Sequence, residues 1–504
     1  MGSLLIRGTS SEFAGAINRF DVVPVQGVVD SPSIKPIEAY RALQKPNQAS
    51  FIFESESPEQ GASRYAYVCS SAESVLRTGE SEPLGDVNPV TALRNQFEAR
   101  AAAPLNSLPS LATGAFGFVA YEAVKHLEPN VGTLPDDPTG SPQAAMIIPS
   151  ELIVFDLVLD QMHILVFATR HDTFESASAR IRHTYQILEG IDGTDEKADV
   201  PFASYDMPSN NTRFPDMVRS AREAIIEGEL IQVVLGQRLE KQTTADPIDI
   251  YQQLSTNNPS PYMYLLNLGD MQLIGASPEL MLRSSNGVAA VHPIAGTRPR
   301  GRTAEEDLQF EADLLSNEKE SAEHVMLVDL ARNDLGRVCK PGTVKVTSLK
   351  HIERYSHVMH LVSRVEGVIA DDSDGIDAFQ AGFPIGTLSG APKIRSIQLA
   401  AELEPEGRGP YCGAIGWFAP NGDVDTGTII RSIVLRDGTA HIQGGAGIVF
   451  DSDPDAENLE SLQKTKAPLL AIARAEAIKE QRWRSEESPP INTSQPATML
   501  LSGD

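Results

Sequence analysis

Two pairs of glutamates have a spacing that could hold a divalent metal. Glu320 and Glu323 stand three positions apart, and so do Glu457 and Glu460. Side chains at that spacing share one face of a helix. Four carboxylate groups with retained waters match the oxygen ligands that Mg²⁺ takes in proteins. The pairs therefore indicate a magnesium site, and the alternative for each pair taken singly is a solvated helix face.

The second pair belongs to a helix whose start is visible in the sequence. Asp453 is a suitable N-cap, and Pro454 suits the first helical position. At 100° per residue, Glu457, Glu460 and Lys464 lie within about 60° of arc on that helix. We therefore expect a lysine beside these two carboxylates.

An arginine occurs where an apolar residue would be expected. Arg431 alternates with Ile429, Ile433 and Leu435, so a strand would place its guanidinium on an apolar face. A buried cation is costly unless it meets an anion. The following strand ends in Gly-Gly-Ala-Gly at residues 444–447, where backbone N–H groups could approach a ligand. Together these features indicate a carboxylate-binding site. The alternatives are a structural ion pair for the arginine and a β-bulge or bend for the glycines.

One histidine lies in a segment that reads as a strand. His360 alternates with Val358 and Val362. A buried histidine with its hydrogen bonds satisfied is the simpler interpretation. A role in proton transfer suits imidazole near neutral pH but needs support from elsewhere in the chain.

Several common catalytic motifs do not occur in the sequence. P-loop, dinucleotide-binding, zinc-protease and serine-hydrolase patterns are missing. No cysteine lies in a G-x-C-x-G elbow, so the chain lacks the nucleophile of a glutaminase. These absences leave the carboxylates, the arginine and the histidine as the candidates for chemistry.

These residues must be positioned by a mixture of helices and strands. Apolar periodicity predicts helices at residues 215–229, 304–334, 391–403 and 454–480. Strand pairs flank tight-turn dipeptides, which favour type I′ hairpins and hence antiparallel sheets. The pattern argues against a doubly wound parallel fold. The predicted strands are residues 151–160, 162–169, 271–285, 288–294, 412–420, 426–436 and 439–450, and the dipeptides are Asn286-Gly287, Asn421-Gly422 and Asp437-Gly438.

The composition is that of a folded, acidic chain. Its 504 residues include 42 Lys and Arg against 68 Asp and Glu, a formal net charge of −26. This charge disfavours nucleic-acid and membrane-surface binding, and no apolar run approaches the length of a membrane span. Three scattered cysteines and no signal peptide favour a cytoplasmic setting. A polar stretch at 191–214 predicts a linker between an N-terminal domain at 1–190 and a second domain at 215–480, and the tail at 485–504 reads as disordered.

Three segments resemble motifs of the chorismate-utilising enzyme family. They read PIAGTRPRG at 293–301, EHVMLVDLARND at 323–334 and GTLSGAPK at 386–393. The resemblance runs from about residue 215 to 480 and extends more weakly into the first domain. The branch that the chain resembles most is anthranilate synthase component I. The resemblance implies an α+β fold in which two large, mainly antiparallel sheets pack as a sandwich with helices outside.

The resemblance also implies roles for particular residues. Glu323 and Glu460 would bind Mg²⁺, with Glu320 and Glu457 assisting. Glu279 would be the general acid, and His360 would act in a later proton transfer. Tyr411, Arg431, Gly445 and Gly447 would hold the enolpyruvyl carboxylate of chorismate. The remaining substrate-site residues would be Gly296, Thr297, Thr387 in the ring pocket, and Lys464, which adds positive charge.

Two positions bear on the nucleophile. Relatives that add water carry a lysine at the position of Gln232, and aminodeoxychorismate synthases typically carry one at the position of Ala295. With neither lysine present, the resemblance implies that ammonia attacks C2 and that a lyase reaction yields anthranilate and pyruvate. The alternatives are an aminodeoxyisochorismate synthase that stops after amination, an aminodeoxychorismate synthase, and a non-catalytic subunit that senses an amino acid.

Partners and a regulator are implied in the same way. Because the chain lacks a glutaminase elbow, ammonia should come from a separate glutaminase subunit, anthranilate synthase component II, in a hetero-oligomer. Tryptophan should inhibit from a separate site in which two segments meet. Its predicted residues are Glu54, Ser55, Pro261, Tyr262 and Met263.

Overall fold

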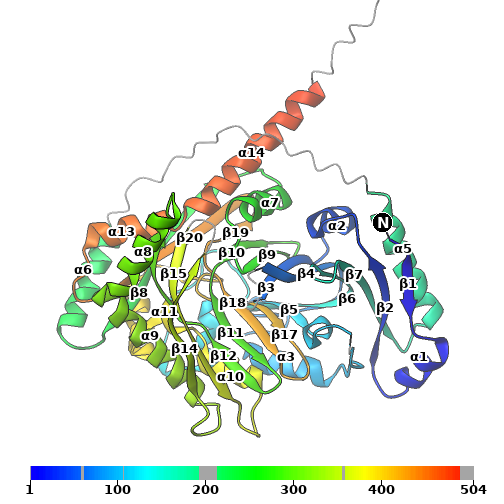
Figure 1. Cartoon of the computed structure of the whole chain (residues 1–504), viewed down its shortest axis with the longest axis horizontal. Helices are drawn as coiled ribbons and strands as arrows, with labels where there is room; N and C mark the ends of the chain where they lie inside the picture. Colours follow the sequence, from blue (N-terminus) through cyan, green and yellow to red (C-terminus); the bar gives the residue numbers. More distant parts are fainter. Residues whose placement is uncertain (1, 58–61, 106, 192–212, 355–357, 488–504) are drawn as a thin grey trace, which may run out of the picture.

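The computed structural model describes residues 2–57, 62–105, 107–191, 213–354 and 358–487 (Figure 1). Nearly all of the predicted linker at 191–214 and of the predicted tail at 485–504 lies outside these residues. The division into two domains therefore stays a prediction.

The first sheet runs across most of the molecule, and every pairing between its strands is antiparallel. It combines strands from both ends of the chain, because β3 pairs directly with β9. In spatial order its strands are β1 Leu4–Arg7, β2 Val22–Asp30, β7 Gln161–Thr169, β6 Ala144–Asp156, β4 Ala62–Thr78, β3 Ser50–Ser57, β9 Tyr262–Asn267, β10 Gln272–Ser277, β19 Ser432–Arg436, β20 Thr439–Ile448, β8 Gln232–Gln242 and β16 Gly390–Ala391.

The second sheet is also antiparallel and is joined to the first through β6. The later half of β6 pairs with β7, whereas its first residues pair with β5 of the second sheet. β4 follows β6 through this corner with register shifts between Val68 and Ser74, as strands that change sheets do. The strands of the second sheet are β5 Ala115–Val119, β17 Ala414–Phe418, β18 Val424–Thr428, β11 Leu280–Ser285, β12 Val288–Val291, β15 Val358–Val368, β13 Ile294–Pro299 and β14 Lys345–Arg354.

An aromatic core lies between the two sheets. The ring of Phe51 in the first sheet packs against that of Phe116 in the second, tilted by 40° and with ring centroids 4.4 Å apart. Trp417 of the second sheet completes the group at 5.3 Å from Phe116. All three side chains are fully buried. The predicted sandwich of two large antiparallel sheets is therefore confirmed.

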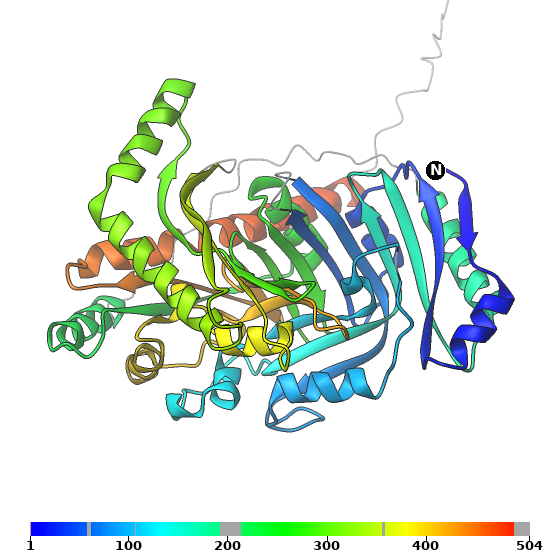
Figure 2. The ribbon, with the colours of Figure 1, turned by 60° about the horizontal axis from the view of Figure 1, so that its bottom comes forward.

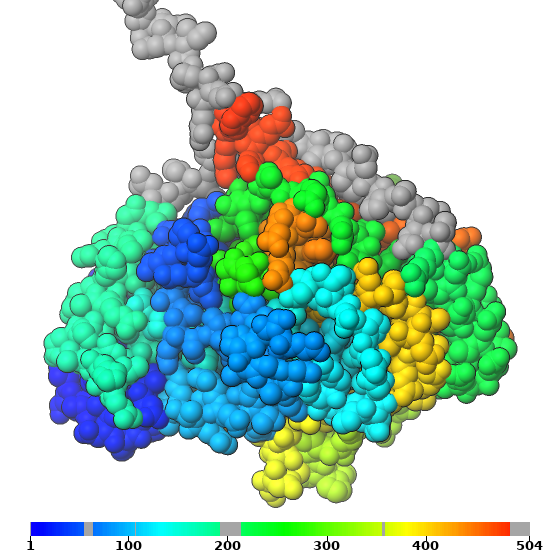
Figure 3. All heavy atoms as spheres, turned by 180° about the vertical axis from the view of Figure 1, so that it is seen from behind, coloured from blue at the N-terminus to red at the C-terminus, as the bar shows by residue number. Residues whose placement is uncertain are grey.

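Helices cover the outer faces of both sheets (Figures 1 and 2). From behind, the N-terminal and C-terminal parts form one continuous surface (Figure 3). Among the described helices, none is both long and apolar enough to cross a membrane. The helices are α1 Ser10–Ile17, α2 Pro36–Leu43, α3 Pro89–Glu98, α4 Val124–Leu127, α5 Phe174–Glu189, α6 Arg213–Ile226, α7 Pro247–Asn257, α8 Ala304–Ser316, α9 Glu318–Gly336, α10 Gly375–Gly382, α11 Gly386–Ser389, α12 Lys393–Leu403, α13 Pro454–Gln463 and α14 Lys466–Glu487.

The tight-turn dipeptides form hairpins as predicted. Asn286 and Gly287 both have positive φ, 51° and 77°, between β11 and β12. Asp437 and Gly438 do the same, at 48° and 75°, between β19 and β20. This is the type I′ geometry. The turn at Asn421-Gly422 is longer than predicted, because Phe418 pairs with Val424 across it.

Four predicted elements are interrupted. The helix at 304–334 is two helices, because Asn317 caps α9 through the backbone N–H of Glu320, at 3.0 Å. The helix at 454–480 divides between α13 and α14, next to its C-cap Lys464. The strand at 271–285 divides into β10 and β11. The strand at 426–436 divides into β18 and β19, with Arg431 between them.

Candidate active site

A register shift between β13 and β15 brings three predicted site residues together. The shift falls at Gly296, whose φ is 63°. Nδ1 of His360 lies 3.1 Å from the carbonyl oxygen of Gly296 and 3.1 Å from the hydroxyl of Thr297. An added Cβ on Gly296 would come within 3.0 Å of Oε2 of Glu320 and closer still to Leu314. A glycine is therefore required where the strand passes this carboxylate.

The imidazole of His360 is held in its neutral form. Burial lowers its pKa, the contact with Gly296 acts in the opposite direction, and the charge of Arg431 lowers the pKa further. Since a carbonyl oxygen can only accept, Nδ1 carries the proton and Nε2 carries the lone pair. The lone pair on Nε2 leaves His360 able to accept a proton.

Glu279 lies at the break between β10 and β11. The backbone N–H of Thr428 donates to its carbonyl at 3.0 Å, and the hydroxyl of Thr387 donates to Oε1 at 2.6 Å. Burial raises the pKa of this carboxyl to about 7, although the Thr387 hydrogen bond and the charge of Lys464 lower it. The side chain can therefore hold a proton at neutral pH, as a general acid must.

Arg431 is placed differently from the prediction. It does not alternate on a strand with Ile429 and Ile433 but lies in the turn between β18 and β19, with φ at 54°. Within the described residues, no hydrogen bond or ion pair engages its guanidinium, so a structural ion pair is not the explanation for it. Burial lowers its pKa, and the neighbouring Tyr411 and Glu460 act against this effect. A half-buried guanidinium without an anion is a site that an anionic ligand would stabilise.

Gly445 of β20 lies close to Tyr411, the residue that also acts on the pKa of Arg431. β20 pairs with β8 in regular register through Gly445 and Gly447, so the β-bulge alternative is wrong. An added Cβ would lie 2.8 Å from the hydroxyl of Tyr411 at Gly445, and 2.6 Å from Nε2 of Gln232 at Gly447. Nζ of Lys464 donates to the carbonyl oxygen of Gly445 at 2.8 Å. The absence of side chains lets Tyr411 and Gln232 pack directly against the backbone of β20.

The carboxylate pairs lie on α9 and α13, at one end of the molecule (Figures 1 and 2). Burial raises the pKa of Glu323 and that of Glu457. The charge of Glu457 also raises the pKa of Glu323, and the charge of Glu460 raises the pKa of Glu457. Glu320 instead accepts from Nη1 of Arg298 at 3.2 Å, and Glu460 pairs with Lys464 at 2.8 Å.

These carboxylates do not form a finished metal site. Within the described part of the chain, no three His, Cys, Asp or Glu side chains converge as metal ligands. The donor set nevertheless suits a hard cation, because Glu323 and Glu457 repel each other and carry oxygen ligands only.

The two segments predicted to hold tryptophan are neighbours. On β3 and β9, Glu54 pairs with Met263 and Ser55 pairs with Tyr262. Tyr262 and Met263 are buried in the core, which leaves Pro261 and the main chain for a ligand to reach. The side chain of Ser55 lies outside the described residues.

Two polar side chains of these segments, Glu54 and Tyr262, already have hydrogen-bond partners. The hydroxyl of Tyr251 donates to Glu54 at 2.6 Å, and the hydroxyl of Tyr262 donates to Asp425 at 2.7 Å. The carboxyl of Glu54 also has a raised pKa, because it is buried.

The sequence predicted Lys464 beside the second acidic pair, and it pairs with Glu460, but sequence reasoning missed two other cations near the acidic pairs. Arg298 contacts Glu320, and Lys319 pairs with Asp451 at 3.3 Å, next to α13. Lys319 directly precedes Glu320, so a basic residue inside an acidic run was the available signal. Arg298 lies within the quoted motif at 293–301, but nothing in the sequence indicated which carboxylate it would meet.

The chain matches known proteins along most of its length. The family model described as chorismate binding enzyme matches residues 48–470. Anthranilate synthase component 1 of Streptomyces coelicolor is 41% identical over 476 residues, covering 92% of this chain and 91% of that one. The probable anthranilate synthase component 1 of Schizosaccharomyces pombe is 38% identical and covers 90% of this chain and 94% of its own.

Solved structures agree with this assignment. Anthranilate synthase component I from Streptococcus pneumoniae superposes with a TM-score of 0.73 at 32% identity, covering 88% of this chain and 99% of that one. A menaquinone-specific isochorismate synthase from Escherichia coli shares the fold, with a TM-score of 0.67 at 16% identity, 92% of this chain and 98% of its own. The chain therefore belongs to the chorismate-binding enzyme family.

Proposed function

We propose that this enzyme of the chorismate-binding family is a lyase that converts chorismate and ammonia into anthranilate, pyruvate and water. Three residues carry the proposal. Glu279 is buried with a pKa of about 7, His360 has a lowered pKa, and the guanidinium of Arg431 has no ion-pair partner among the described residues. The similarity to anthranilate synthase component 1 chains along most of the sequence supports it.

The substrate would be held by its enolpyruvyl carboxylate. Arg431 supplies the guanidinium, and Tyr411 and the backbone of Gly445 and Gly447 complete the contacts. Lys464, already fixed on the carbonyl of Gly445, adds positive charge on the same side. A charge-assisted contact of this kind is the strongest available to an uncompensated arginine.

Two residues favour ammonia over the other nucleophiles used in this family. Gln232 cannot deprotonate water, and Ala295 cannot attack the ring. The carboxamide oxygen of Gln232 is buried and makes no hydrogen bond in the described structure, so it can accept from an N–H of ammonia. As nitrogen bonds to C2, the ring double bonds shift and the C4 hydroxyl leaves. Glu279 gives the proton that turns this leaving group into water.

The second step would remove pyruvate. His360 takes the proton from C2 through Nε2, the ring becomes aromatic, and the enol ether oxygen leaves with the three-carbon unit. Proton return to that unit gives pyruvate, so chorismate and ammonia balance anthranilate, pyruvate and water. An enzyme in which this step fails would release aminodeoxyisochorismate, which is the second candidate.

Magnesium is part of the proposal. Glu323 and Glu457, whose repulsion a cation would relieve, and Glu320 and Glu460 are the residues that would hold it. Bound Mg²⁺ would supply positive charge to a second carboxylate of the substrate. The chain's own residues carry the proton transfers in this scheme.

The proposal includes a partner and a regulator. A separate glutaminase subunit would supply ammonia, since the chain has no G-x-C-x-G elbow. Tryptophan would bind where β3 and β9 meet, near Glu54 and Pro261. The name "component 1" on the relatives supports an assembly with a second component.

The experiment is an assay of the purified chain with chorismate, Mg²⁺ and either an ammonium salt or glutamine. We expect anthranilate, identified by mass and fluorescence, with ammonium only. Aminodeoxyisochorismate as the sole product would support the second candidate. Anthranilate from glutamine without a partner would contradict the proposed separate glutaminase, and unchanged chorismate would contradict the function.

A further inference from the structure

A fully buried ion pair lies behind the candidate active site. Arg408 and Glu404, in and next to the loop between α12 and β17, are 2% and 7% exposed. Nε and Nη2 of Arg408 donate to the two carboxylate oxygens at 2.8 and 2.7 Å. Burying both charges is costly, and packing alone would be served as well by apolar side chains. The pair is therefore better explained by what else it holds.

The remaining donors of this arginine reach two active-site elements. Nη1 of Arg408 donates to the carbonyl of Leu388 at 3.1 Å, and Nη2 donates to the carbonyl of Val234 at 2.7 Å. Leu388 directly follows Thr387 in the four-residue helix α11. Val234 lies on β8, opposite Gly447. One guanidinium thus fixes both the segment of the ring pocket and the strand beside the carboxylate site.

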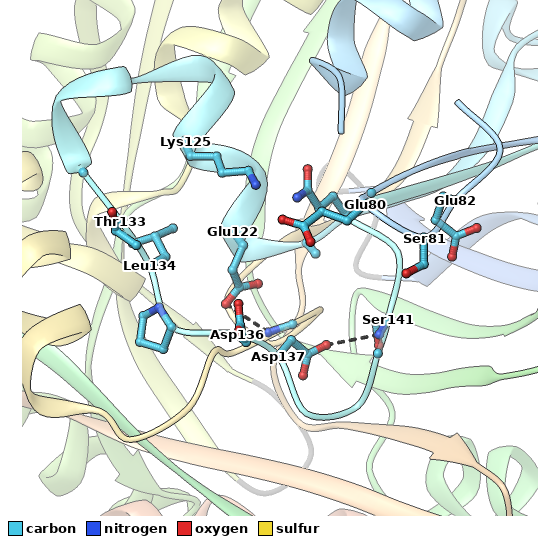
Figure 4. A pocket seen from close by; sticks show the side chains of 17 residues that line it. Glu80, Ser81, Glu82, Glu122, Lys125, Thr133, Leu134, Asp136, Asp137 and Ser141 are labelled. Carbon is cyan, nitrogen blue, oxygen red and sulfur yellow. Dashed lines mark hydrogen bonds between the residues drawn. The ribbon is translucent and has the colours of Figure 1, made fainter. Parts of the chain in front are cut away.

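The backbone of Arg408 is fixed as well. Its N–H donates to Oε1 of Glu122 at 2.6 Å, and its carbonyl accepts from Gln443 at 2.7 Å. Glu122 lies on the wall of an acidic cavity of about 490 Å³, where it also accepts from the N–H of Gly409 (Figure 4). The Tyr121 ring, 4.4 Å from the guanidinium carbon, covers the other side. Arg408 is therefore held through both its side chain and its backbone.

We propose that Arg408 is a positioning residue for the candidate general acid Glu279, acting through Thr387. Arg408 holds the carbonyl of Leu388 and so fixes α11. The fixed helix aims the hydroxyl of Thr387 at Glu279, at 2.6 Å. That hydrogen bond favours the charged form of Glu279 and opposes the effect of burial on its pKa. Loosening α11 would weaken the bond, so the acid would hold its proton to higher pH. This inference rests on the proposed function.

The test compares the pH dependence of kcat in the wild type, Arg408→Lys and the double variant Arg408→Met/Glu404→Gln. Free ammonia is held constant at every pH. Weakening the hydrogen bond from Thr387 to Glu279 should move the alkaline limb of the kcat profile to higher pH by roughly half to one unit. It should also lower kcat about three- to tenfold. Thr387→Val should cause a similar shift, and adding Arg408→Lys to it should cause no further shift.

The control is Arg100→Met/Glu73→Gln, which removes a second bidentate pair in the N-terminal part of the chain, with a buried arginine and a glutamate that is 32% exposed. It should lower stability without moving the pH profile. Arg408 variants that lose stability but keep the wild-type profile would overturn the inference, as would shifts that add to that of Thr387→Val. Arg408→Lys retains a cation, so it serves if the double variant does not fold. A wild type that leaves chorismate unchanged would instead contradict the proposed function.

Discussion

Nδ1 of His360 lies 3.1 Å from the carbonyl oxygen of Gly296, at the register shift between β13 and β15. This contact fixes the tautomer of the imidazole, and it depends on a glycine that also passes close to Glu320. The hydrogen bond of His360 and the close passage of the strand beside Glu320 thus occur at the same irregularity of the sheet.

We predict that His360→Met separates the two steps. Because His360 is assigned to loss of the C2 proton, the variant should still consume chorismate and should accumulate aminodeoxyisochorismate. Mass analysis of quenched reactions checks this. The assignment is wrong if a folded variant, verified by circular dichroism, consumes no chorismate.

We predict that Glu279→Gln removes activity and changes the pH dependence of stability. Loss of a general acid should lower kcat by about 10²- to 10⁴-fold. The pKa of this carboxyl is raised from 4.5 to about 7 in the folded state, so the folded state binds more protons in that window. The wild type should therefore lose stability as pH rises from about 4.5 to 7.

Glutamine cannot titrate, so the same variant should not show this loss. The free energy of unfolding of the variant, relative to that of the wild type, should be up to about 3 kcal/mol higher at pH 8 than at pH 4. Denaturant titrations at the two pH values measure it. Equal differences between variant and wild type at both pH values would contradict the raised pKa.

We predict that Mg²⁺ binds between α9 and α13. Glu323→Gln and Glu460→Gln should abolish most turnover and weaken Mg²⁺ binding in calorimetry while the fold persists. The control is Glu318→Gln, an exposed residue at the start of the same α9. Full activity of the wild type in EDTA, or equal Mg²⁺ binding by all three variants, would refute this site.

We predict that tryptophan binds at the junction of β3 and β9 and opposes chorismate. A coupling of about 1–3 kcal/mol corresponds to a change in affinity of roughly 5- to 150-fold, and it must be reciprocal. Calorimetric titration of tryptophan, with and without a saturating unreactive chorismate analogue, measures this factor. Absence of binding, or binding that the analogue does not change, would remove the regulatory claim.

Local features were predictable from the sequence, and long-range ones were not. Type I′ turns at Asn286-Gly287 and Asp437-Gly438 depend on residues that tolerate positive φ, so the dipeptides sufficed. The break at Arg431 was missed because its alternation with isoleucines looks the same in a continuous strand and in a strand interrupted by a turn. The resemblance supplied Glu279 and Thr387 separately. Their hydrogen bond joins residues 108 positions apart, and the hydrogen bond of Arg408 to Leu388 behind them spans 20 positions. Neither had a local signal.

The most direct measurement of the central claim is the identity of the nucleophile. The purified chain is given chorismate, Mg²⁺ and ¹⁵N-ammonium in ¹⁸O-water, and the products are analysed by mass spectrometry. The account predicts anthranilate that carries one ¹⁵N and no ¹⁸O on its ring, with one pyruvate formed for each anthranilate. A hydroxylated product that carries ¹⁸O on the ring, with no ¹⁵N incorporated, would contradict it.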